Sequence, residues 1–356
     1  MAGRSSGGAH AGADRYRGIG RRRSVTVELV SLIEAHLART LERHRGASPV
    51  YEMLRFHFGY DEPGKFQSGK RLRPQLLLRT ALEEGGRIEE ALDAAVAIEI
   101  LHNYSLVHDD IEDGDELRHG RTTIWKRFGV PHGINTGDAL CAISYLTLLH
   151  EHSCAPAERV VAMLHVLHEA NLHMCEGQGL DIGFETRSIV TMAQYRDMIA
   201  GKTGALFSAS CELGALAAGC TWERARQYAR LGRAYGLAFQ IRDDVLGTWG
   251  TTDVTGKPSG ADIARRKWSF PIVWALGTPP SRDREIVARA YDTNACIARE
   301  HVGDVIAALD RLGARAAADA VHDRALDDAD ALAAEAHVDA NASIRNFLAL
   351  GARRVA

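Results

Sequence analysis

Residues 94–113 read AAVAIEILHNYSLVHDDIED, an almost uninterrupted apolar run that ends in a cluster of carboxylates. The same Ala- and Leu-rich composition, largely free of Pro, recurs in segments 88–109, 137–151, 158–180, 190–218 and 223–246. Ala and Leu are strong helix formers, and these runs are longer than typical strands. Strand-like alternation is nearly absent, so the sequence predicts an all-α protein.

The runs follow one another without a linker between two cores. Pro and Gly fall mostly between them, as in residues 129–133 and 256–260. We therefore expect residues 24–356 to form one large bundle of about ten or more helices, given 3.6 residues per turn and short connections. Residues 1–23 are rich in Gly, Ser and Arg and contain few large apolar side chains, which predicts a disordered tail.

Composition excludes several classes of protein. The 43 basic and 46 acidic residues leave a formal charge of −3, so no overall field attracts nucleic acid. No apolar run approaches the roughly 20 residues of a membrane-spanning helix. The six cysteines are scattered without a CxxC pair, which predicts neither a zinc site nor a disulfide framework and favours a cytoplasmic protein.

The first carboxylate cluster is Asp109-Asp110-Ile111-Glu112-Asp113. On a helix Asp109 and Asp113 lie one turn apart and Asp110 is adjacent, so we expect the three carboxylates on one face. Like charges at this spacing destabilise a helix, so the cluster needs a cation, and carboxylate oxygens suit Mg²⁺. The alternative is a solvated acidic helix end, which the apolar run before the motif disfavours.

A second pair, Asp243 and Asp244, ends the apolar helical run FQIRDD at residues 239–244. Cations cluster near the two motifs, at Lys70, Arg71, Arg73, Arg118, Arg121, Lys257 and Lys267. Two carboxylate clusters among fixed cations describe a site for a polyanion held partly through metal. Diphosphate fits, because Mg²⁺ bridges carboxylate to phosphate while Arg and Lys bind the remaining oxygens.

With both motifs in place, the chain resembles the trans-isoprenyl diphosphate synthases, the polyprenyl synthetase family. The match runs from about Phe66 to Val273 and contains, in order, GKRLRP, HNYSLVHDDIED, RHGRTT, GDAL, GQGLDI, GKTGALF, FQIRDDVLG and GKPSGADIARRK. The resemblance implies a helical bundle around a deep apolar cavity, with the two Asp motifs facing each other across its mouth. It also implies a homodimer.

The resemblance implies a prenyltransferase that joins isopentenyl diphosphate head-to-tail to an allylic diphosphate (dimethylallyl, geranyl or farnesyl). Neutralising the leaving diphosphate with metal ions and cations ionises the allylic C–O bond. The double bond of isopentenyl diphosphate then attacks the carbocation, and a proton is lost. An apolar cavity protects the cation from water, and no Ser, Cys or His nucleophile is required.

The resemblance also assigns roles to the charged motifs. Three Mg²⁺ ions, for which Mn²⁺ can substitute, would be held by Asp109, Asp110, Asp113, Asp243 and Asp244. The allylic diphosphate would be bound by Arg118, Lys202, Lys257 and Lys267. Isopentenyl diphosphate would be bound by Lys70, Arg73 and His102. Thr203 and Gln240 would line the reacting centre and stabilise the developing positive charge.

Two positions depart from the family pattern. Gly247 stands where the fullest second motif has a third Asp, so we expect a metal site with one ligand fewer. His119 follows Arg118 where a second Arg usually binds isopentenyl diphosphate. Histidine is a weaker, pH-dependent cation without bidentate geometry, and Arg121 is the alternative group for this role.

Product length rests on Tyr104, five residues before Asp109 and hence about 7.5 Å further along the helix. In the resembling family an aromatic residue here limits elongation, whereas the neighbouring Ser105 is too small to do so. This predicts the geranylgeranyl diphosphate (C20) type. The alternative for Tyr104 is an ordinary core aromatic.

Other functions stay open beside a C20 synthase. A farnesyl diphosphate (C15) synthase uses the same motifs. A non-catalytic regulatory subunit is disfavoured because both aspartate pairs are kept. A terpene cyclase on the same scaffold would need no second-substrate set of Lys70, Arg73 and His102.

Overall fold

The computed structural model describes residues 22–61, 69–150, 153–251, 258–292, 297–339 and 344–347. The first half contains α1 (Arg22–Arg43), α2 (Val50–His57), α3 (Leu72–Glu83), α4 (Ile88–Glu112), β1 (Leu117–Arg118), β2 (Arg121–Thr122), α5 (Ile124–Phe128), α6 (Val130–Leu146) and α7 (Ala157–Phe184). The second half contains α8 (Met192–Ile199), η2 (Ala200–Gly204), α9 (Ala205–Ala217), α10 (Trp222–Trp249), α12 (Ala261–Ala264), α13 (Phe270–Leu276), α14 (Arg282–Tyr291), α15 (Arg299–Leu312) and α16 (Ala314–Glu335).

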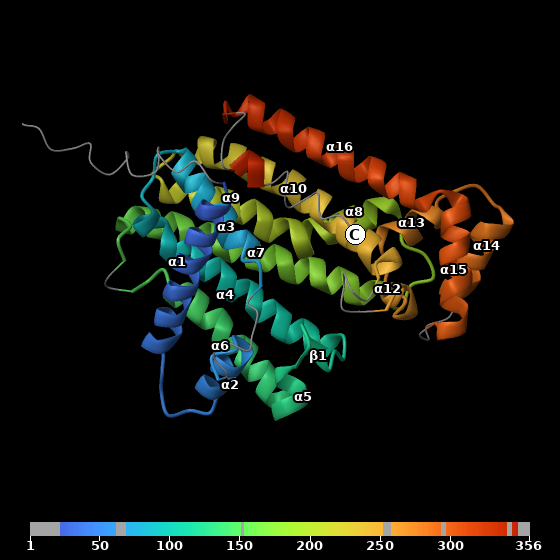
Figure 1. Cartoon of the computed structure of the whole chain (residues 1–356), viewed down its shortest axis with the longest axis horizontal. Coiled ribbons are helices and arrows are strands. Elements are labelled where there is room, and N and C mark those ends of the chain that lie inside the picture. Colours follow the sequence, from blue (N-terminus) through green and yellow to red (C-terminus); the bar gives the residue numbers. More distant parts are fainter. Residues whose placement is uncertain are drawn as a thin grey trace, which may run out of the picture.

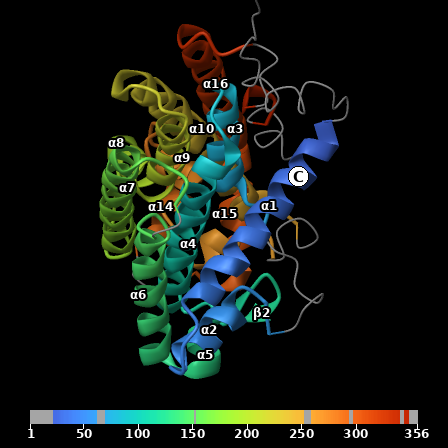
Figure 2. The ribbon, with the colours of Figure 1, turned by 90° about the vertical axis from the view of Figure 1, so that its left-hand side faces the viewer.

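The predicted all-α bundle is confirmed in this part of the chain. Helix α10 packs against α9 and α16, while α4 packs against α3 and α6 (Figure 1). Seen from the side, α6, α7 and α8 lie at one edge of the molecule and α1 at the opposite edge (Figure 2). The predicted tail, residues 1–23, lies almost wholly outside the described residues, which begin at Arg22.

Helix α4 passes through the core because it is apolar on every side. Ala95, Ile98 and Leu101 are completely buried, and they belong to a cluster that joins α3, α4, α7, α9 and α10. A helix that is apolar all round must be surrounded by protein. A second cluster joins α8, the end of α10 and α13 to α15. Both carboxylate motifs therefore follow directly on buried helices.

A short hairpin that the sequence did not predict follows the first motif. Strands β1 and β2 pair antiparallel, with Leu117 opposite Thr122. His119 and Gly120 form the two-residue turn with φ values of 50° and 77°, the left-handed geometry that such hairpins require. The hairpin fixes the backbone of Arg118 just beyond the carboxylates.

A single π-helical turn, η2, joins α8 to α9 and contains Lys202 and Thr203. Gly177 on α7 allows it to approach, because a Cβ atom there would collide with the backbone nitrogen of Lys202. π-Helical turns inside longer helices are frequent at functional sites. Here the turn brings Lys202 and Thr203 directly against α7.

Arg71 ties α1, α3 and α4 together. Its guanidinium is buried and donates to Glu34 at 2.7 Å and to Glu99 at 2.6 Å. The residue has a φ of 49°, the left-handed geometry, at the start of α3. None of the described helices is long and apolar enough to cross a membrane.

Replacing Arg71 tests how far this buried cation stabilises the bundle. Arg71→Met leaves both carboxylates without their cation and should lower the free energy of unfolding by about 3–5 kcal/mol, measured by urea denaturation. Arg45→Met is the matched control, because its pair with Glu42 is exposed and worth about 0–1 kcal/mol. Equal effects of the two substitutions would contradict the central role of Arg71.

Candidate active site

The first motif occupies the last turn of α4 and its C-cap, Asp113. Burial raises the pKa of Asp109 to about 6. Within the described part of the chain, the side chain of Asp109 accepts no hydrogen bond. Asp110 is more deeply buried and accepts a 2.7 Å bond from Arg118 Nε, while burial raises its pKa to about 6. Asp110 is therefore tied to the hairpin through Arg118, whereas Asp109 has no such partner among the described residues.

Lysines from two other elements face Asp109 and Asp113. Lys202 Nζ donates to Asp181 on α7 at 2.5 Å. Although burial opposes it, the pKa of Lys202 is raised because Asp181 and Asp109 stabilise the ammonium. Lys267 Nζ donates to Asp113 Oδ2 at 3.0 Å. The ammonium groups thus lie between carboxylates from several elements.

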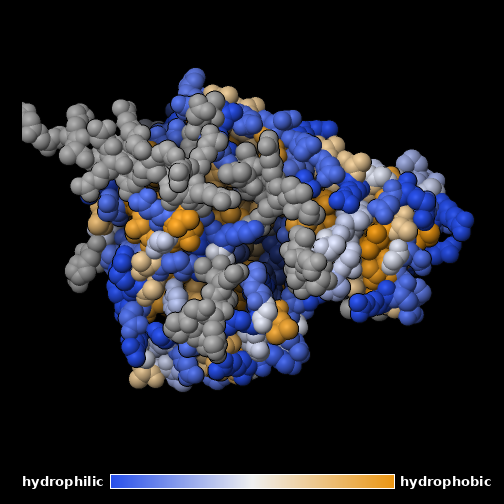
Figure 3. All heavy atoms as spheres, viewed as in Figure 1, coloured by the Kyte–Doolittle hydropathy of each residue, from blue (hydrophilic) through white to orange (hydrophobic). Residues whose placement is uncertain are grey.

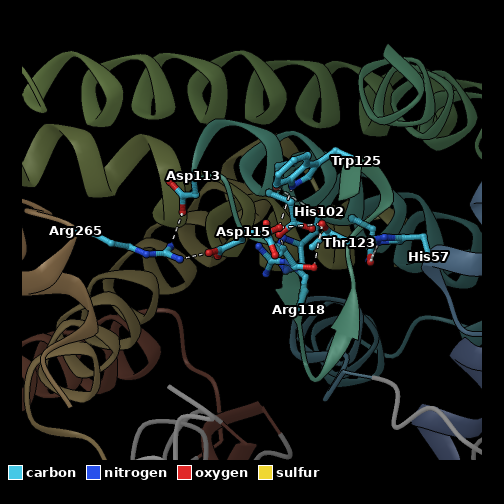
Figure 4. Close-up of polar contacts among 12 residues, drawn as sticks. His57, His102, Asp113, Asp115, Arg118, Thr123, Trp125 and Arg265 are labelled. Atoms are coloured by element: carbon cyan, nitrogen blue, oxygen red, sulfur yellow. Dashed lines mark hydrogen bonds and ion pairs between the residues drawn. The ribbon is translucent and has the colours of Figure 1, made fainter. Parts of the chain in front are cut away.

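Arg265 connects the two sides of the site (Figure 4). It extends from the end of α12, lies 3.8 Å from Asp113 Oδ2 and donates to Asp115. Asp115 itself follows the first motif, and its backbone carbonyl accepts from Thr123 Oγ1 and Trp125 Nε1. The segment after the second motif is therefore tied by ion pairs to the end of the first.

The second motif divides into an exposed and a buried aspartate. Asp243 is exposed, whereas burial raises the pKa of Asp244 to about 7. Asp244 Oδ2 accepts from Tyr195 Oη at 2.5 Å and from the backbone nitrogen of Phe270 at 2.7 Å. Its Oδ1 accepts from Gln240 at 2.8 Å. Protein donors thus occupy both oxygens of Asp244.

Thr203 and Gln240, predicted to act together, are in contact. Thr203 Oγ1 donates to Gln240 Oε1 at 2.5 Å, and Gln240 passes a hydrogen bond on to Asp244. The chain of three polar side chains connects the π-helical turn to α10. It holds the hydroxyl of Thr203 in a fixed orientation between the two motifs.

The group predicted for the second substrate is partly assembled. The Arg73 guanidinium lies 4.6 Å from the centre of the Phe207 ring, and burial lowers its pKa to about 10, so it stays charged at neutral pH. Burial, with Arg73 and Arg118 adding to it, holds the pKa of His102 well below its ordinary value. Lys70 is exposed. His102 is therefore a neutral hydrogen-bonding group here.

Three other predicted positions are His119, Arg121 and Lys257. His119 is exposed in the hairpin turn. Arg121 donates to the Phe56 carbonyl at 2.9 Å and to Asp61 at 3.0 Å. These contacts tie Arg121 to α2 and the loop after it, and its role as a substitute for the missing arginine stays a prediction. Lys257 lies outside the described residues.

Sequence reasoning missed Asp181, Tyr195 and Arg265, which all contact predicted site residues. Asp181 lies in the quoted motif GQGLDI, one turn after Gly177 on α7, and this spacing was a usable signal. Arg265 precedes Lys267 in the quoted ADIARRK. Tyr195 carried no signal, since its contact with Asp244 joins residues 49 positions apart.

Tyr104 spans from α4 to α7. Its hydroxyl lies 3.6 Å from Cys175 Sγ on α7, and its ring meets His108 edge-on at 5.0 Å between centroids. Ser105 Oγ donates to the His102 carbonyl at 2.9 Å, so it binds back to its own helix. Of the two residues, Tyr104 is the one that extends across the space between helices.

The donor set fits divalent ions held jointly with a ligand. Among the described residues, no group of three His, Cys, Asp or Glu side chains is arranged to hold a metal ion alone. Mg²⁺ is commonly bound by one or two carboxylates, with waters and substrate phosphates completing its shell. Asp109, half-buried and without a hydrogen bond from the residues that the structure describes, and exposed Asp243 suit this role. A hydrophilic hollow separates the part of the molecule with β1 and β2 from the part with α12 to α15 (Figure 3).

The raised pKa of Asp109 gives a pH dependence with a definite sign. Between its unfolded value of 3.8 and its folded value of about 6, the folded chain keeps a proton that the unfolded chain releases. The free energy of unfolding therefore falls as the pH rises through this range. In protein freed of metal by a chelator, Asp109→Asn should raise the free energy of unfolding by about 1–3 kcal/mol at pH 8.

At pH 3 the same substitution should change the free energy of unfolding little, because this pH lies below both pKa values and Asp109 is then largely protonated in both states. Urea denaturation at the two pH values measures the difference. Asp327→Asn, at an exposed position on α16, is the control and should change neither value. A destabilising effect of Asp109→Asn at pH 8 would contradict the assigned burial.

Comparisons with known proteins agree with this site. The sequence model of the polyprenyl synthetase family matches residues 65–309. A geranylgeranyl diphosphate synthase of Mycobacterium tuberculosis is 38% identical over 258 residues, 71% of this chain and 72% of its own. A (2E,6E)-farnesyl diphosphate synthase of the same organism is 35% identical over 269 residues, 74% of this chain and 72% of its own.

The fold agrees as well. The crystal structure of a geranylgeranyl pyrophosphate synthetase from Pyrococcus horikoshii superposes with a TM-score of 0.81 at 30% sequence identity, covering 96% of this chain and 98% of that one. Enzymes of the family use isopentenyl and allylic diphosphates and depend in general on Mg²⁺. The chain belongs to the polyprenyl synthetase family and is a short-chain trans-prenyltransferase.

Proposed function

We propose that this enzyme makes geranylgeranyl diphosphate, with its two aspartate motifs binding the allylic diphosphate through three Mg²⁺ ions. The observation that carries the proposal is the convergence of Asp109 and Asp113 at the end of α4 with Lys202 from the π-helical turn and Lys267 from the segment after the second motif. Two carboxylates are best suited to the ions: Asp243, which is exposed, and Asp109, which accepts no hydrogen bond from the described residues. Asp113 would join them once Lys267 leaves it and binds a phosphate oxygen. Asp110 and Asp244 accept hydrogen bonds from protein donors, and we propose that they act mainly by fixing the position of each motif.

When bound, the ions would neutralise the diphosphate and favour its departure from the allylic carbon. Lys202, Arg118 and Lys267 would bind its remaining oxygens, and Lys257 is proposed for the same role from the sequence. Thr203 and Gln240 present oxygens toward the carbon that becomes positive. The double bond of isopentenyl diphosphate forms the new C–C bond, and the proton lost from the product passes to the released diphosphate.

The second substrate would be held by cations and by a neutral histidine. Arg73 supplies a charge that packing against Phe207 holds in place. Lys70 lies exposed where a diphosphate can reach it, and neutral His102 can donate one hydrogen bond. A terpene cyclase would have no need of this second set.

The length of the product would be set by Tyr104. A chain growing from the first motif along α4 would meet its ring, which spans toward Cys175 on α7. The C20 product is the one that the family resemblance implies for an aromatic residue at this place, which here lies five residues of helix, about 7.5 Å, before Asp109. Farnesyl diphosphate stays the alternative product.

A homodimer is proposed from the apolar surface of α6 and α7. These adjacent helices form one edge of the molecule (Figure 2). Their large exposed apolar side chains are Val130, Ile134, Leu146, Val161, Leu172, Leu180 and Ile182. Exposed apolar side chains on neighbouring helices are a feature of many protein interfaces. A second copy presenting the same helices would cover it with two-fold symmetry.

The activity test is incubation with isopentenyl diphosphate and each allylic primer in turn, with products sized by chromatography. Turnover should disappear with chelator and return with Mg²⁺ or Mn²⁺. Asp109→Ala should lower kcat by several orders of magnitude while circular dichroism still reports a helical fold, because this residue acts only through the ions. Near-normal turnover of Asp109→Ala would overturn the assignment of the site.

Substituting Tyr104 tests the length determinant. Tyr104→Ala removes the ring and should move the products to C25 and longer, with total turnover largely kept. Ser105→Ala, which removes only a hydroxyl bonded within α4, is the control and should leave the products unchanged. An active Tyr104→Ala enzyme with unaltered products would place the end of the cavity elsewhere.

The proposed dimer has its own test. Leu172→Glu introduces a charge on the α7 surface and should convert the dimer to a monomer in sedimentation velocity. Val27→Glu, on the exposed side of α1, should leave the dimer intact. A protein that is monomeric before any substitution would contradict the proposal.

A further inference from the structure

A cavity of about 310 Å³ lies between the C-terminal half of α1, the loop after it and α2. Helix α2 lies beside this end of α1 (Figure 2). Small-molecule sites range from about 300 to 1,000 Å³, so the cavity is large enough for a small ligand. The described residues that line it include none of those assigned above to the substrates or to the metal ions. The cavity is therefore separate from the proposed active site.

The inner surface of the cavity is mostly apolar and is built from both helices. Leu41 on α1 and Leu54 on α2 line it and are buried. The half-buried rings of Tyr51 and Tyr60 line it as well. Gly46 allows the loop to come close to Tyr51, because a Cβ atom on Gly46 would lie 2.7 Å from that ring. These side chains would cover the apolar body of a ligand.

Three exposed arginines, Arg39, Arg45 and Arg55, line the same cavity. Arg45 Nη1 donates to Glu42 Oε1 at 2.8 Å, and Arg55 Nη1 donates to Glu42 Oε2 at 3.5 Å. Arg39 donates to His36 Nδ1 at 3.1 Å and pairs with no carboxylate among the described residues. The three guanidinium groups thus face one lining carboxylate, which leaves positive charge for an anion to neutralise.

Tyr60 adds a polar group that lacks a partner. Its hydroxyl is buried and forms no hydrogen bond with the residues that the structure describes. Burial, with Glu34 adding to it, raises the pKa of Tyr60 to about 12, so the hydroxyl keeps its proton at neutral pH. Buried polar groups in folded proteins nearly always have a partner. A ligand that carries an acceptor oxygen would supply one.

Cations beside an apolar interior suit an amphiphilic anion. Arginine binds phosphate oxygens in a bidentate manner. Exposed ion pairs such as those of Glu42 are worth only about 0.2–1 kcal/mol, so a more highly charged head group can displace this carboxylate. A prenyl diphosphate has both a charged head and an apolar body. The small volume favours a short chain, such as the ten carbons of a geranyl group, over C20.

We propose that the cavity between α1 and α2 is a second binding site for a short-chain prenyl diphosphate, and that Arg39, Arg45 and Arg55 hold the diphosphate without metal ions. The ligand class rests on the activity of the family and not on the length of the product. The site differs from the active site in needing no Mg²⁺, and this difference makes it measurable on its own.

Calorimetric titration with geranyl S-thiolodiphosphate, an analogue that resists ionisation, measures binding without turnover. The titration is run in chelator, because the proposed active site binds its allylic diphosphate through Mg²⁺ and the cavity does not. Wild-type protein should bind the analogue under these conditions. Combining Arg45→Met with Arg55→Met should weaken this binding about tenfold or more, because charge-assisted hydrogen bonds to the diphosphate are lost.

Glu42→Gln should have the opposite effect. It frees Arg45 and Arg55 from their internal partner and should tighten binding by up to about fivefold, the value of an exposed ion pair. Arg87→Met is the matched control, because this exposed arginine pairs with glutamates outside the cavity and its replacement should leave the affinity unchanged. Inorganic pyrophosphate, which has no apolar body, should bind about tenfold more weakly or worse.

Absence of binding in chelator would overturn the inference. Binding that the double substitution leaves unchanged, in proteins with matching thermal unfolding curves, would also overturn it. Pyrophosphate that binds as tightly as the analogue would contradict the assigned ligand class. Asp109→Ala separates this site from the active site: it should lose only the binding that depends on Mg²⁺. If Asp109→Ala keeps the Mg²⁺-dependent binding, the proposed active site fails instead.

Discussion

The crowding of carboxylates, several of them partly or fully buried, at the end of α4 is the constraint around which the site is built. A helix C-terminus carries negative partial charge, so anions there are unfavourable. Helix α4 nevertheless has no basic residue in its last turn, where it carries Asp109, Asp110 and Glu112. Burial adds to the penalty, as the raised pKa values of both aspartates indicate.

The cations that offset this charge come from three other elements, one directly after α4 and two far along the chain. The hairpin contributes Arg118, the π-helical turn Lys202, and the segment after α12 Lys267. Each of these elements has a local irregularity: a left-handed turn, a widened helical turn and a four-residue helix. The regular helices form the buried core. The irregular segments place the positively charged side chains next to the carboxylates at the end of α4. In the proposed function Lys202 and Lys267 leave their carboxylate partners, Asp181 and Asp113, and bind the diphosphate instead.

The helices of the core and most of the charged residues of the site could be predicted from the sequence. Apolar runs and aspartate pairs are local patterns, so the helices of α4 and α10 and both motifs could be read directly. Asp110 could not be distinguished from Asp109, because the difference depends on Arg118 folding back through a hairpin of two-residue strands. The partner of Lys202 was equally hidden, since Asp181 reaches it only where glycines allow α7 and η2 to touch. Arg121 fits the charge pattern of the site, and its contacts with α2 and Asp61 could not be predicted because they join residues about 60 positions apart.

Anomalous diffraction from crystals soaked with Mn²⁺ and inorganic pyrophosphate would test the account most directly. The account predicts metal peaks between the carboxylates of Asp109 and Asp113 on one side and Asp243 on the other. It also predicts that Lys202 and Lys267 leave Asp181 and Asp113 for pyrophosphate oxygens. Pyrophosphate bound without metal between the two motifs, or with both lysine pairs intact, would contradict it.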